Sequence, residues 1–541
     1  MSKKTGLIAF FIIISSQLVL AQENRYMVFF TDKENSSFSL DKPEEFLSER
    51  AIQRRLKQDI PVTNADLPVN MGYLQQLDNS GADVFFSSKW MNAALVQMDE
   101  RLVNSLVQLD FVREVEYIAP GAKLSSSKDP VEIPETFDEP AYKLADSKMQ
   151  LGMINADDMH ADGYTGKDVW IAVFDAGFTG VNRFKPFEHL HINNRVVAVN
   201  DFVYNSGNPY QYHDHGTEVL SVIAADYLDF QGTAYDASFV LAVTEDVRSE
   251  FRIEEYNWLL AAEFADSVGV DIIHSSLGYS VFGKEPSMNY TYEDLDGYTA
   301  TITQAVNFAR DRGILVVTSA GNEGNSNWQY ITAPADARGI LTVGAVTENY
   351  EKASFSSIGP TADGRIKPDV MALGSGTAVM FGNGGISQSN GTSYAAPLVA
   401  GLAAGIWQAN PEWSNIDVIN AIKYTSSRSL NPDALFGYGI PDYKIARQGA
   451  VLSVDQIINR DITVYPNPFR DSKIYIDTRR LMDSGAVQLT LYDQKGSVIV
   501  RKMIVAHKER IMLDVPGVKA GSYFLKIHSE KFSKTVKLIK Y

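Results

Sequence analysis

Four short segments place an acid, a base, an amide and a hydroxyl where predicted strands end or predicted helices begin. They are Val-Phe-Asp-Ala-Gly ending at Gly177, His-Gly-Thr from His215, Ser-Ala-Gly-Asn ending at Asn322 and Gly-Thr-Ser from Gly391. Continuous apolar runs at 169–174 and 314–317 precede the first and third segments, and such runs are typical of strands buried on both faces. Strands that alternate with helices form a mostly parallel sheet with both faces covered, which predicts a three-layer α/β domain.

The other two segments open predicted helices. His215 begins a helix that runs to Tyr227, and Ser393 opens an Ala-rich helix over 394–406, in which Pro397 is tolerated in the first turn. In open α/β sheets, ligands bind beyond the carboxyl ends of the strands. We therefore expect all four groups on one rim of the sheet.

Together these groups can carry out nucleophilic catalysis. A serine hydroxyl is a poor nucleophile at neutral pH, and it needs an imidazole to take its proton, a carboxylate to orient that imidazole and a donor for the oxyanion that forms. We interpret Ser393 as the nucleophile, His215 as the base that later protonates the leaving group, and Asp175 as the orienting carboxylate. Asn322 is expected to donate its side-chain amide to the oxyanion, beside the backbone N–H of Ser393.

Simpler interpretations exist for each residue taken alone. Asp175 could form a turn, His215 and Asn322 could be helix-cap or loop groups, and Ser393 could be an N-cap. The segment His213-Asp214-His215 also suggests a metal, because two imidazoles lie one residue apart. Zinc sites need three or four ligands, and a chain with 8 His and no Cys offers no obvious third ligand, so no metal ligand is predicted.

The chain order Asp175, His215, Ser393 is that of subtilisin, and it differs from the orders in chymotrypsin and the α/β-hydrolases. Residues 145–448 resemble a subtilisin-like serine protease of the subtilase, or peptidase S8, family. Further segments carry this resemblance: Ser276-Leu277-Gly278, Phe355–Pro360 followed by Asp363–Asp369, and Gly437-Tyr438-Gly439.

The resemblance implies a subtilisin-like three-layer fold and a serine endopeptidase that hydrolyses protein or peptide substrates through an acyl-enzyme. Residues 276–278 are similar to the strand that pairs with the substrate backbone in this family. The implied substrate-binding residues are Ser276, Leu277, Gly278, Ser319, Ala320 and Gly321. No cofactor is required, and Ca²⁺ is a candidate structural ion without assignable ligands.

Three positions depart from the family pattern. Ala176 replaces the Ser or Thr that usually follows the acid, which predicts the loss of one hydrogen bond to the carboxylate. His274 stands where an Asn commonly precedes the substrate strand, and Tyr394 follows the nucleophile where many relatives have Met. Methionine beside an active serine can oxidise to a polar sulfoxide, so Tyr394 predicts tolerance to peroxide.

The N-terminus is typical of an exported protein. Lys3 and Lys4 precede an apolar run over 7–14, and residues 19–21 end in a small residue suited to cleavage, so 1–21 is predicted to be a signal peptide. A membrane anchor is the alternative, but the run is shorter than the ~20 residues that span a bilayer. Cysteine is absent, which excludes disulfides, and a net charge of −17 argues against nucleic acid as a partner.

Residues 22–120 are predicted to form a separate α+β unit. The pattern predicts strands over 26–31, 82–88, 93–98 and 111–118 and a helix over 102–109. This unit resembles the propeptide of subtilisin-like proteases, which assists folding and blocks the active site until it is removed. The alternative is an unrelated small module.

Two further segments are predicted to be exposed. Residues 121–144 are polar and proline-marked, which is typical of a linker and processing region. The insertion from Tyr279 to Ala300 is rich in Tyr and acid, including Glu293, Asp294 and Asp296. It could border the substrate cleft or bind calcium, but charged runs are more often solvated surface loops.

The C-terminal part, 461–541, is predicted to be a small all-β, sandwich-like domain after a linker over 449–460. Candidate strands cover 473–476, 487–492, 497–500 and 523–527. Tyr-Pro-Asn-Pro-Phe from Tyr465, Leu-Tyr-Asp from Leu491 and Gly-Ser-Tyr from Gly521 resemble a type IX secretion sorting domain. The alternative is a carbohydrate- or surface-binding β-sandwich.

These observations favour a secreted or cell-surface endopeptidase, made as a preproenzyme and exported through the periplasm and the type IX machinery. Its predicted partners are peptide substrates, its own propeptide as inhibitor and the secretion machinery, and it is predicted to be a monomer that binds no nucleic acid. Three other functions stay open at this point: a catalytically silent binding protein, an adhesin that acts through the terminal domain, and a serine hydrolase that cleaves esters.

Overall fold

A computed structural model describes most of the chain. The described residues are 23–124, 128, 130–283, 285–447, 464–470, 472–477, 486–505, 510–515, 517–528 and 533–541. The predicted signal peptide, 1–21, and the predicted linker, 449–460, lie outside these ranges. Within the described ranges, no helix combines the length and the apolar character that a membrane span requires.

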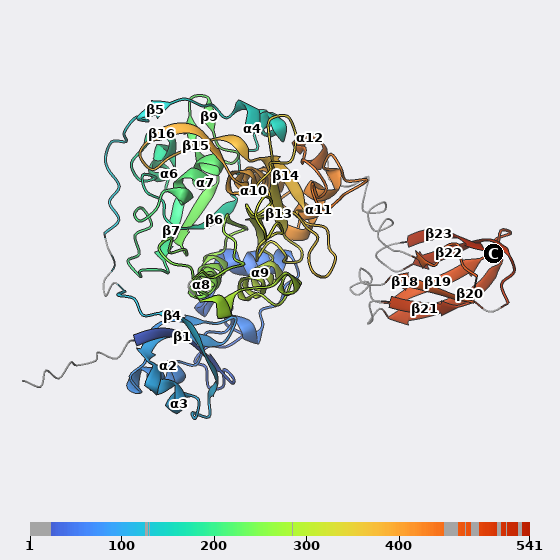
Figure 1. The fold of residues 1–541 in the computed structure, drawn as a ribbon, viewed down its shortest axis with the longest axis horizontal. Helices are drawn as coiled ribbons and strands as arrows, with labels where there is room; N and C mark the ends of the chain where they lie inside the picture. Colours follow the sequence, from blue (N-terminus) through green and yellow to red (C-terminus); the bar gives the residue numbers. More distant parts are fainter. Residues whose placement is uncertain are drawn as a thin grey trace, which may run out of the picture.

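The part predicted to be catalytic, hereafter the catalytic part, is built on a seven-stranded sheet (Figure 1). Every neighbouring pair of strands is parallel, in the order β14-β13-β12-β11-β6-β10-β7. The strands are β6 Trp170–Asp175, β7 Val196–Asp201, β10 Ser238–Val243, β11 Ile272–Ser275, β12 Leu315–Ser319, β13 Leu341–Val346 and β14 Val370–Leu373. The predicted parallel α/β sheet is thus confirmed, with strands at both expected apolar runs.

Both faces of this sheet are buried, and successive side chains of a strand point to opposite faces. In β6, Ile171 and Val173 belong to one hydrophobic cluster, whereas Ala172 and Phe174 belong to another on the opposite face. The helices that supply the first cluster are α7 His215–Ala224, α10 Thr392–Ala409 and α11 Asn415–Thr425. The second cluster is covered by α8 Ile253–Val268 and α9 Thr301–Asp311.

The smaller elements are β5 Tyr142–Lys143, α4 Lys148–Met153, α5 Ala156–Ala161, α6 Glu188–Ile192, β8 Asp226–Tyr227, β9 Phe230–Gln231, the hairpin β15 Ser375–Met380 and β16 Gly385–Asn390, and α12 Tyr443–Ala446.

The N-terminal unit is an antiparallel sheet in the order β2-β3-β1-β4 with three helices. Its elements are β1 Glu23–Phe30, α1 Glu49–Lys57, α2 Met71–Asn79, β2 Asp83–Ser88, β3 Ala93–Asp99, α3 Val103–Leu106 and β4 Val112–Pro120. All four predicted strands are present, and the predicted helix over 102–109 is the short α3. The sequence analysis missed α1 and α2.

This unit packs on the outer side of α8 and α9 (Figure 1). Met27 and Phe29 of β1 lie in the same hydrophobic cluster as Trp258 of α8 and Ile302 of α9. The α+β unit and the catalytic sheet therefore share one continuous core.

The two segments expected to be exposed are partly packed instead. In the predicted linker, Phe137 is buried and stacks on His191, and β5 pairs in parallel with β16. In the insertion, Phe282 and Leu295 are fully buried. The apolar side chains within each polar stretch pack against the catalytic part. The polar composition of each stretch had indicated exposure, so the sequence analysis did not predict this packing.

The C-terminal part forms two antiparallel sheets around its own apolar cluster. The strands are β17 Val464–Tyr465, β18 Lys473–Asp477, β19 Ala486–Tyr492, β20 Val498–Val505, β21 Arg510–Asp514, β22 Gly521–His528 and β23 Ser533–Lys540. All four predicted strands are present. The analysis missed β17, β21 and β23, because these strands are short or mix Lys with apolar residues.

Candidate active site

Asp175 is the last residue of β6, and its side chain is fully buried. The carboxylate accepts a hydrogen bond from the backbone N–H of Ala176 at 2.7 Å. A backbone donor therefore supports one carboxylate oxygen, although Ala176 has no side-chain hydroxyl. Both oxygens also face the imidazole of His215.

His215 is the first residue of α7, and its Nδ1 lies 2.8 and 3.0 Å from the two oxygens of Asp175. This contact places the proton on Nδ1, so Nε2 is left as the basic nitrogen. Burial lowers the pKa of the His215 imidazole, but the charge and hydrogen bond of Asp175 raise it more, to about 9. The imidazolium that proton transfer creates is therefore stabilised.

Gly216 permits the close approach of these two residues. A Cβ at this position would lie 2.4 Å from the backbone oxygen of Gly177 and 2.9 Å from the Cβ of Asp175. The neighbouring His213 accepts the backbone N–H of His215 through Nδ1 at 3.1 Å. This imidazole nitrogen thus orders the start of α7. In the described part of the chain, no group of three or more candidate metal ligands occurs.

Ser393 lies in the first turn of α10 and is buried. Its hydroxyl points to the carbonyl oxygen of Ser276 at 3.5 Å, and no hydrogen bond joins it to His215 among the described contacts. Catalytic hydrogen bonds are often long without substrate and tighten in the complex. The ring of the next residue, Tyr394, has its centroid 6.1 Å from that of His215, so α10 and α7 meet at this point.

Asn322 follows β12 with its amide orientation set by two contacts. Its Oδ1 accepts from the backbone N–H and from the hydroxyl of Thr392, both at 2.9 Å. Because Oδ1 is bound by Thr392, beside Ser393, the NH₂ group of Asn322 is left as a donor. This is the orientation that an oxyanion donor requires.

Of the predicted substrate-binding residues, Ser276 contacts Ser393 directly. Ser276 donates its hydroxyl to the carbonyl oxygen of Ser393 at 2.9 Å, and Leu277 and Gly278 continue the chain from there. A Cβ at Gly278 would lie 2.1 Å from the Thr332 hydroxyl, so only glycine fits this approach. Ser319, Ala320 and Gly321 run from the end of β12 to Asn322.

His274, on β11, contacts the side chain of Ser276. Its Nε2 lies 3.1 Å from the hydroxyl of Ser276, which already donates to Ser393, so the imidazole is the donor in this pair. Burial and the charge of His215 lower the pKa of His274 to about 3. This histidine is therefore neutral and links β11 to the nucleophile's backbone.

Two Tyr–Glu pairs beside His215 were missed by the sequence analysis. Tyr394 donates its hydroxyl to Glu218 on α7, and Tyr279 donates to Glu245 at 2.9 Å. Glu218 could have been noticed, since it stands three residues after His215 on a predicted helix and so shares its face. Glu245, two residues beyond β10, carried no local signal.

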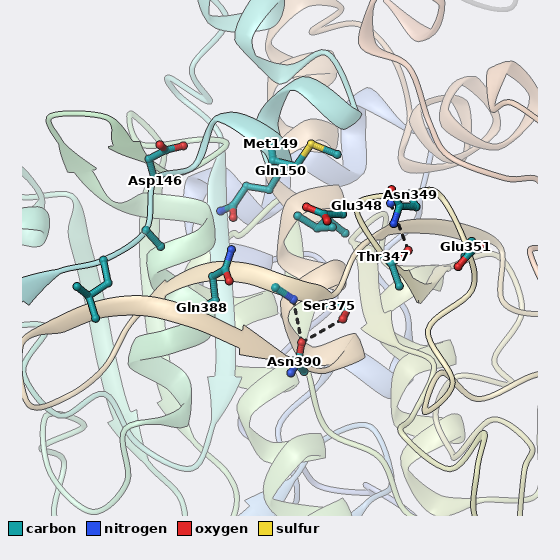
Figure 2. Close-up of a pocket in the computed structure, with 14 residues that line it drawn as sticks. Asp146, Met149, Gln150, Thr347, Glu348, Asn349, Glu351, Ser375, Gln388 and Asn390 are labelled. Carbon is teal, nitrogen blue, oxygen red and sulfur yellow. Dashed lines mark hydrogen bonds between the residues drawn. The ribbon is translucent and has the colours of Figure 1, made fainter.

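A separate pocket of about 550 Å³ lies beside the β15–β16 hairpin (Figure 2). Asp146, Glu348 and Glu351 contribute acid to its lining, and Asn390 accepts from Ser375 and from a backbone N–H within it. None of the four predicted catalytic residues lines this pocket. It is therefore distinct from the catalytic site.

Comparison with known proteins agrees with this geometry. The model of the subtilase family matches residues 166–439. The model of the peptidase S8 propeptide domain of Bacteroidota matches 25–132, and that of the secretion system C-terminal sorting domain matches 463–541.

Individual proteins show the same relationship. The chain is 31% identical to Subtilisin NAT of Bacillus subtilis subsp. natto, over 69% of this chain and 85% of that protein. It is 33% identical to the subtilisin of Bacillus pumilus, over 55% of this chain and 98% of that protein. The crystal structure of the epidermin leader peptide processing serine protease of Staphylococcus aureus shares the fold, with a TM-score of 0.54 and 16% identity over 80% of this chain and 100% of that one.

The fold and its relatives define a serine peptidase of α/β architecture. The chain belongs to the subtilase family and is a subtilisin-like serine endopeptidase with a propeptide domain. Its C-terminal domain is a type IX secretion sorting domain, which directs the protein to the cell surface or the extracellular space. These findings confirm the predicted family, fold class and export route, and they identify the chain as a subtilisin-like peptidase.

Proposed function

We propose that this enzyme hydrolyses peptide bonds by acyl transfer through Asp175, His215 and Ser393, with Asn322 as an oxyanion donor. The observation that carries the proposal is the bond between buried Asp175 and Nδ1 of His215, which leaves Nε2 basic on the helix that meets α10. The same four residues were predicted from the sequence.

In the first half of the reaction, His215 Nε2 takes the proton of Ser393 as Oγ attacks the substrate carbonyl. The negative charge on the carbonyl oxygen is stabilised by the Asn322 amide and the Ser393 backbone N–H. His215 then gives its proton to the leaving amine. In the second half, His215 takes a proton from water as the water oxygen attacks the acyl-enzyme. It then returns that proton to Oγ of Ser393 as the ester bond breaks and the acid product leaves. None of these steps needs a cofactor.

We further propose that the chain is a preproenzyme with the predicted division: signal peptide 1–21, propeptide 22–120, processing region 121–144, peptidase 145–448, linker 449–460 and sorting domain 461–541. The propeptide would act as an inhibitor until it is cut. Its docking on α8 is supported by Glu263, whose carboxylate accepts the backbone N–H groups of Lys89 and Trp90 and the hydroxyl of Ser88.

In the described part of the acidic insertion, Asp294 and Asp296 are already bound within their own turns. Asp294 accepts from the backbone N–H and hydroxyl of Thr291, and Asp296 accepts from Tyr298 and Thr299. These carboxylates cap their own turns and do not fit the six or more oxygens that Ca²⁺ takes. Calcium as a structural ion and the monomeric state stay predictions.

A fluorophosphonate probe tests the proposal. Wild type and Ser393→Ala, each as the chain from residue 22, are treated with the probe and followed by intact mass and casein cleavage. Labelling, shedding of the propeptide and casein cleavage in the wild type alone would support the nucleophile and self-processing together. If folded, propeptide-free wild type takes no label, the acyl-transfer proposal fails. Labelling together with cleavage of an ester substrate, but not of casein, would indicate either a peptidase of narrow specificity or an esterase.

A further inference from the structure

The hydroxyl of Tyr394 bridges the two helices that carry the nucleophile and the base. It donates to Oε2 of Glu218, and both side chains are buried, with 6% and 8% of their residue surfaces exposed. Tyr394 directly follows Ser393 on α10, and Glu218 follows His215 by three residues on α7. Any sliding of α10 against α7 would therefore break this hydrogen bond.

Glu218 also acts on the imidazole electrostatically. Residues three apart on a helix lie on the same face, and the charge of Glu218 adds to that of Asp175 in raising the pKa of His215. Burial raises the pKa of Glu218 itself, whereas the Tyr394 hydrogen bond and the charge of His215 lower it. Tyr394 thus favours the ionised form of Glu218, which in turn favours imidazolium.

Other groups also face His215, from each element around it. They are Asp175 at the end of β6, His213 and Asp214 before α7, Glu245 after β10, His274 on β11 and Tyr394 on α10. Two of these acids have contacts of their own: Asp214 accepts the backbone N–H of Gly382 at 3.3 Å, and Glu245 accepts the Tyr279 hydroxyl. Glu218 differs from them because its partner is the residue next to the nucleophile.

We propose that Glu218 is a positioning residue for the serine peptidase reaction, which together with Tyr394 joins the helix of the nucleophile to the helix of the base and places a second negative charge beside the imidazolium. This inference rests on the proposed role of His215 as the base. The carboxylate does not touch the substrate.

The test is the pH dependence of inactivation by the fluorophosphonate probe, whose rate follows the fraction of neutral His215. Wild type, Glu218→Gln, Tyr394→Phe and the double variant are made as full-length chains and matured with a trace of wild-type enzyme, and thermal melting confirms that they fold. Glu218→Gln is expected to move the acid limb of the rate profile to lower pH by roughly half to one unit, because it removes a nearby opposite charge. Tyr394→Phe should move the limb in the same direction, and the double variant should move it no further than Glu218→Gln alone.

Matched controls come from a similar Tyr–Glu pair on the face of the sheet that α8 and α9 cover. Tyr290 donates to Glu255 of α8 at 2.9 Å, and this pair does not contact the catalytic residues. Glu255→Gln and Tyr290→Phe should leave the acid limb in place. An unmoved limb in Glu218→Gln and Tyr394→Phe, with labelling intact, would overturn the positioning role and leave the proposed function standing. An equal shift in the control variants would also overturn it. Absence of labelling in wild type at every pH would instead refute the proposed function itself.

Discussion

The contact between propeptide and catalytic domain offers a quantitative test at Arg54. This α1 side chain is 5% exposed and makes three hydrogen bonds across the interface: to Asp266 Oδ1 at 2.6 Å, to the Val270 carbonyl at 2.6 Å and to the Arg312 carbonyl at 3.1 Å. Burial lowers the pKa of Arg54, to about 10, despite the opposing charge of Asp266. The guanidinium is therefore charged at neutral pH, and Arg54 and Asp266 form a buried ion pair.

Arg54→Ala removes one partner of this buried ion pair. Breaking such a pair typically costs about 3–5 kcal/mol, because the other charge is left buried and uncompensated. Asp266 keeps two cations, Arg55 at 2.9 Å and Lys89 at 3.2 Å. We therefore expect the lower end of the range, about 3 kcal/mol, which corresponds to roughly a 10²-fold weaker complex.

The assay is inhibition of the mature enzyme by the predicted propeptide, residues 22–120, added in trans. The inhibition constant of Arg54→Ala should rise about 10²-fold over wild type. Arg101→Ala is the control, since Arg101 forms an exposed pair with Asp99 within the propeptide, and its inhibition constant should match wild type. A folded Arg54→Ala propeptide that inhibits within about fivefold of wild type would show that the buried network does not hold the complex.

Three further outcomes are expected of the mature enzyme. Asn322→Ala should lower kcat by about the 10²–10³-fold known from deleting the oxyanion asparagine of subtilisin itself, with little change in KM; a loss below tenfold would remove Asn322 from this role. The kcat/KM should fall as pH falls through the pKa of His215, because imidazolium cannot accept the proton of Ser393. Burial lowers this pKa but Asp175 raises it to about 9, so an acid limb below the ordinary 6.5 would contradict the reasoning. Activity should survive dilute peroxide, because Tyr394 stands where Met would oxidise; rapid loss of activity, with no oxidised Met elsewhere by mass spectrometry, would refute this.

Much of the architecture could be predicted because its signals are local. The buried strands read as continuous apolar runs, since a parallel strand has both faces covered and no solvent side to display. The reacting groups sit in short motifs at strand ends and helix starts, where backbone geometry sets the side-chain direction within a few residues. The amino-acid sequence alone therefore suffices to predict that Asp175, His215, Asn322 and Ser393 share one rim of the sheet.

The contacts that tune and regulate the site could not be predicted in the same way. Tyr394 and Glu218 are 176 residues apart, and Arg54 and Asp266 are 212 apart. Their pairing depends on how α10 packs on α7 and how α1 docks on α8. Phe137 likewise lies in a stretch of polar composition, and its burial depends on a partner, His191, supplied by a different segment.

The sequence by itself thus determined the fold class, the sorting domain and the proposed reacting groups, because each is encoded within a few neighbouring residues. Only the tertiary structure decided which carboxylates besides Asp175 lie near the imidazole, which groups fix the Asn322 amide and how the propeptide is held. Each of these depends on side chains brought together from distant elements, where burial converts a weak surface attraction into a strong and specific one.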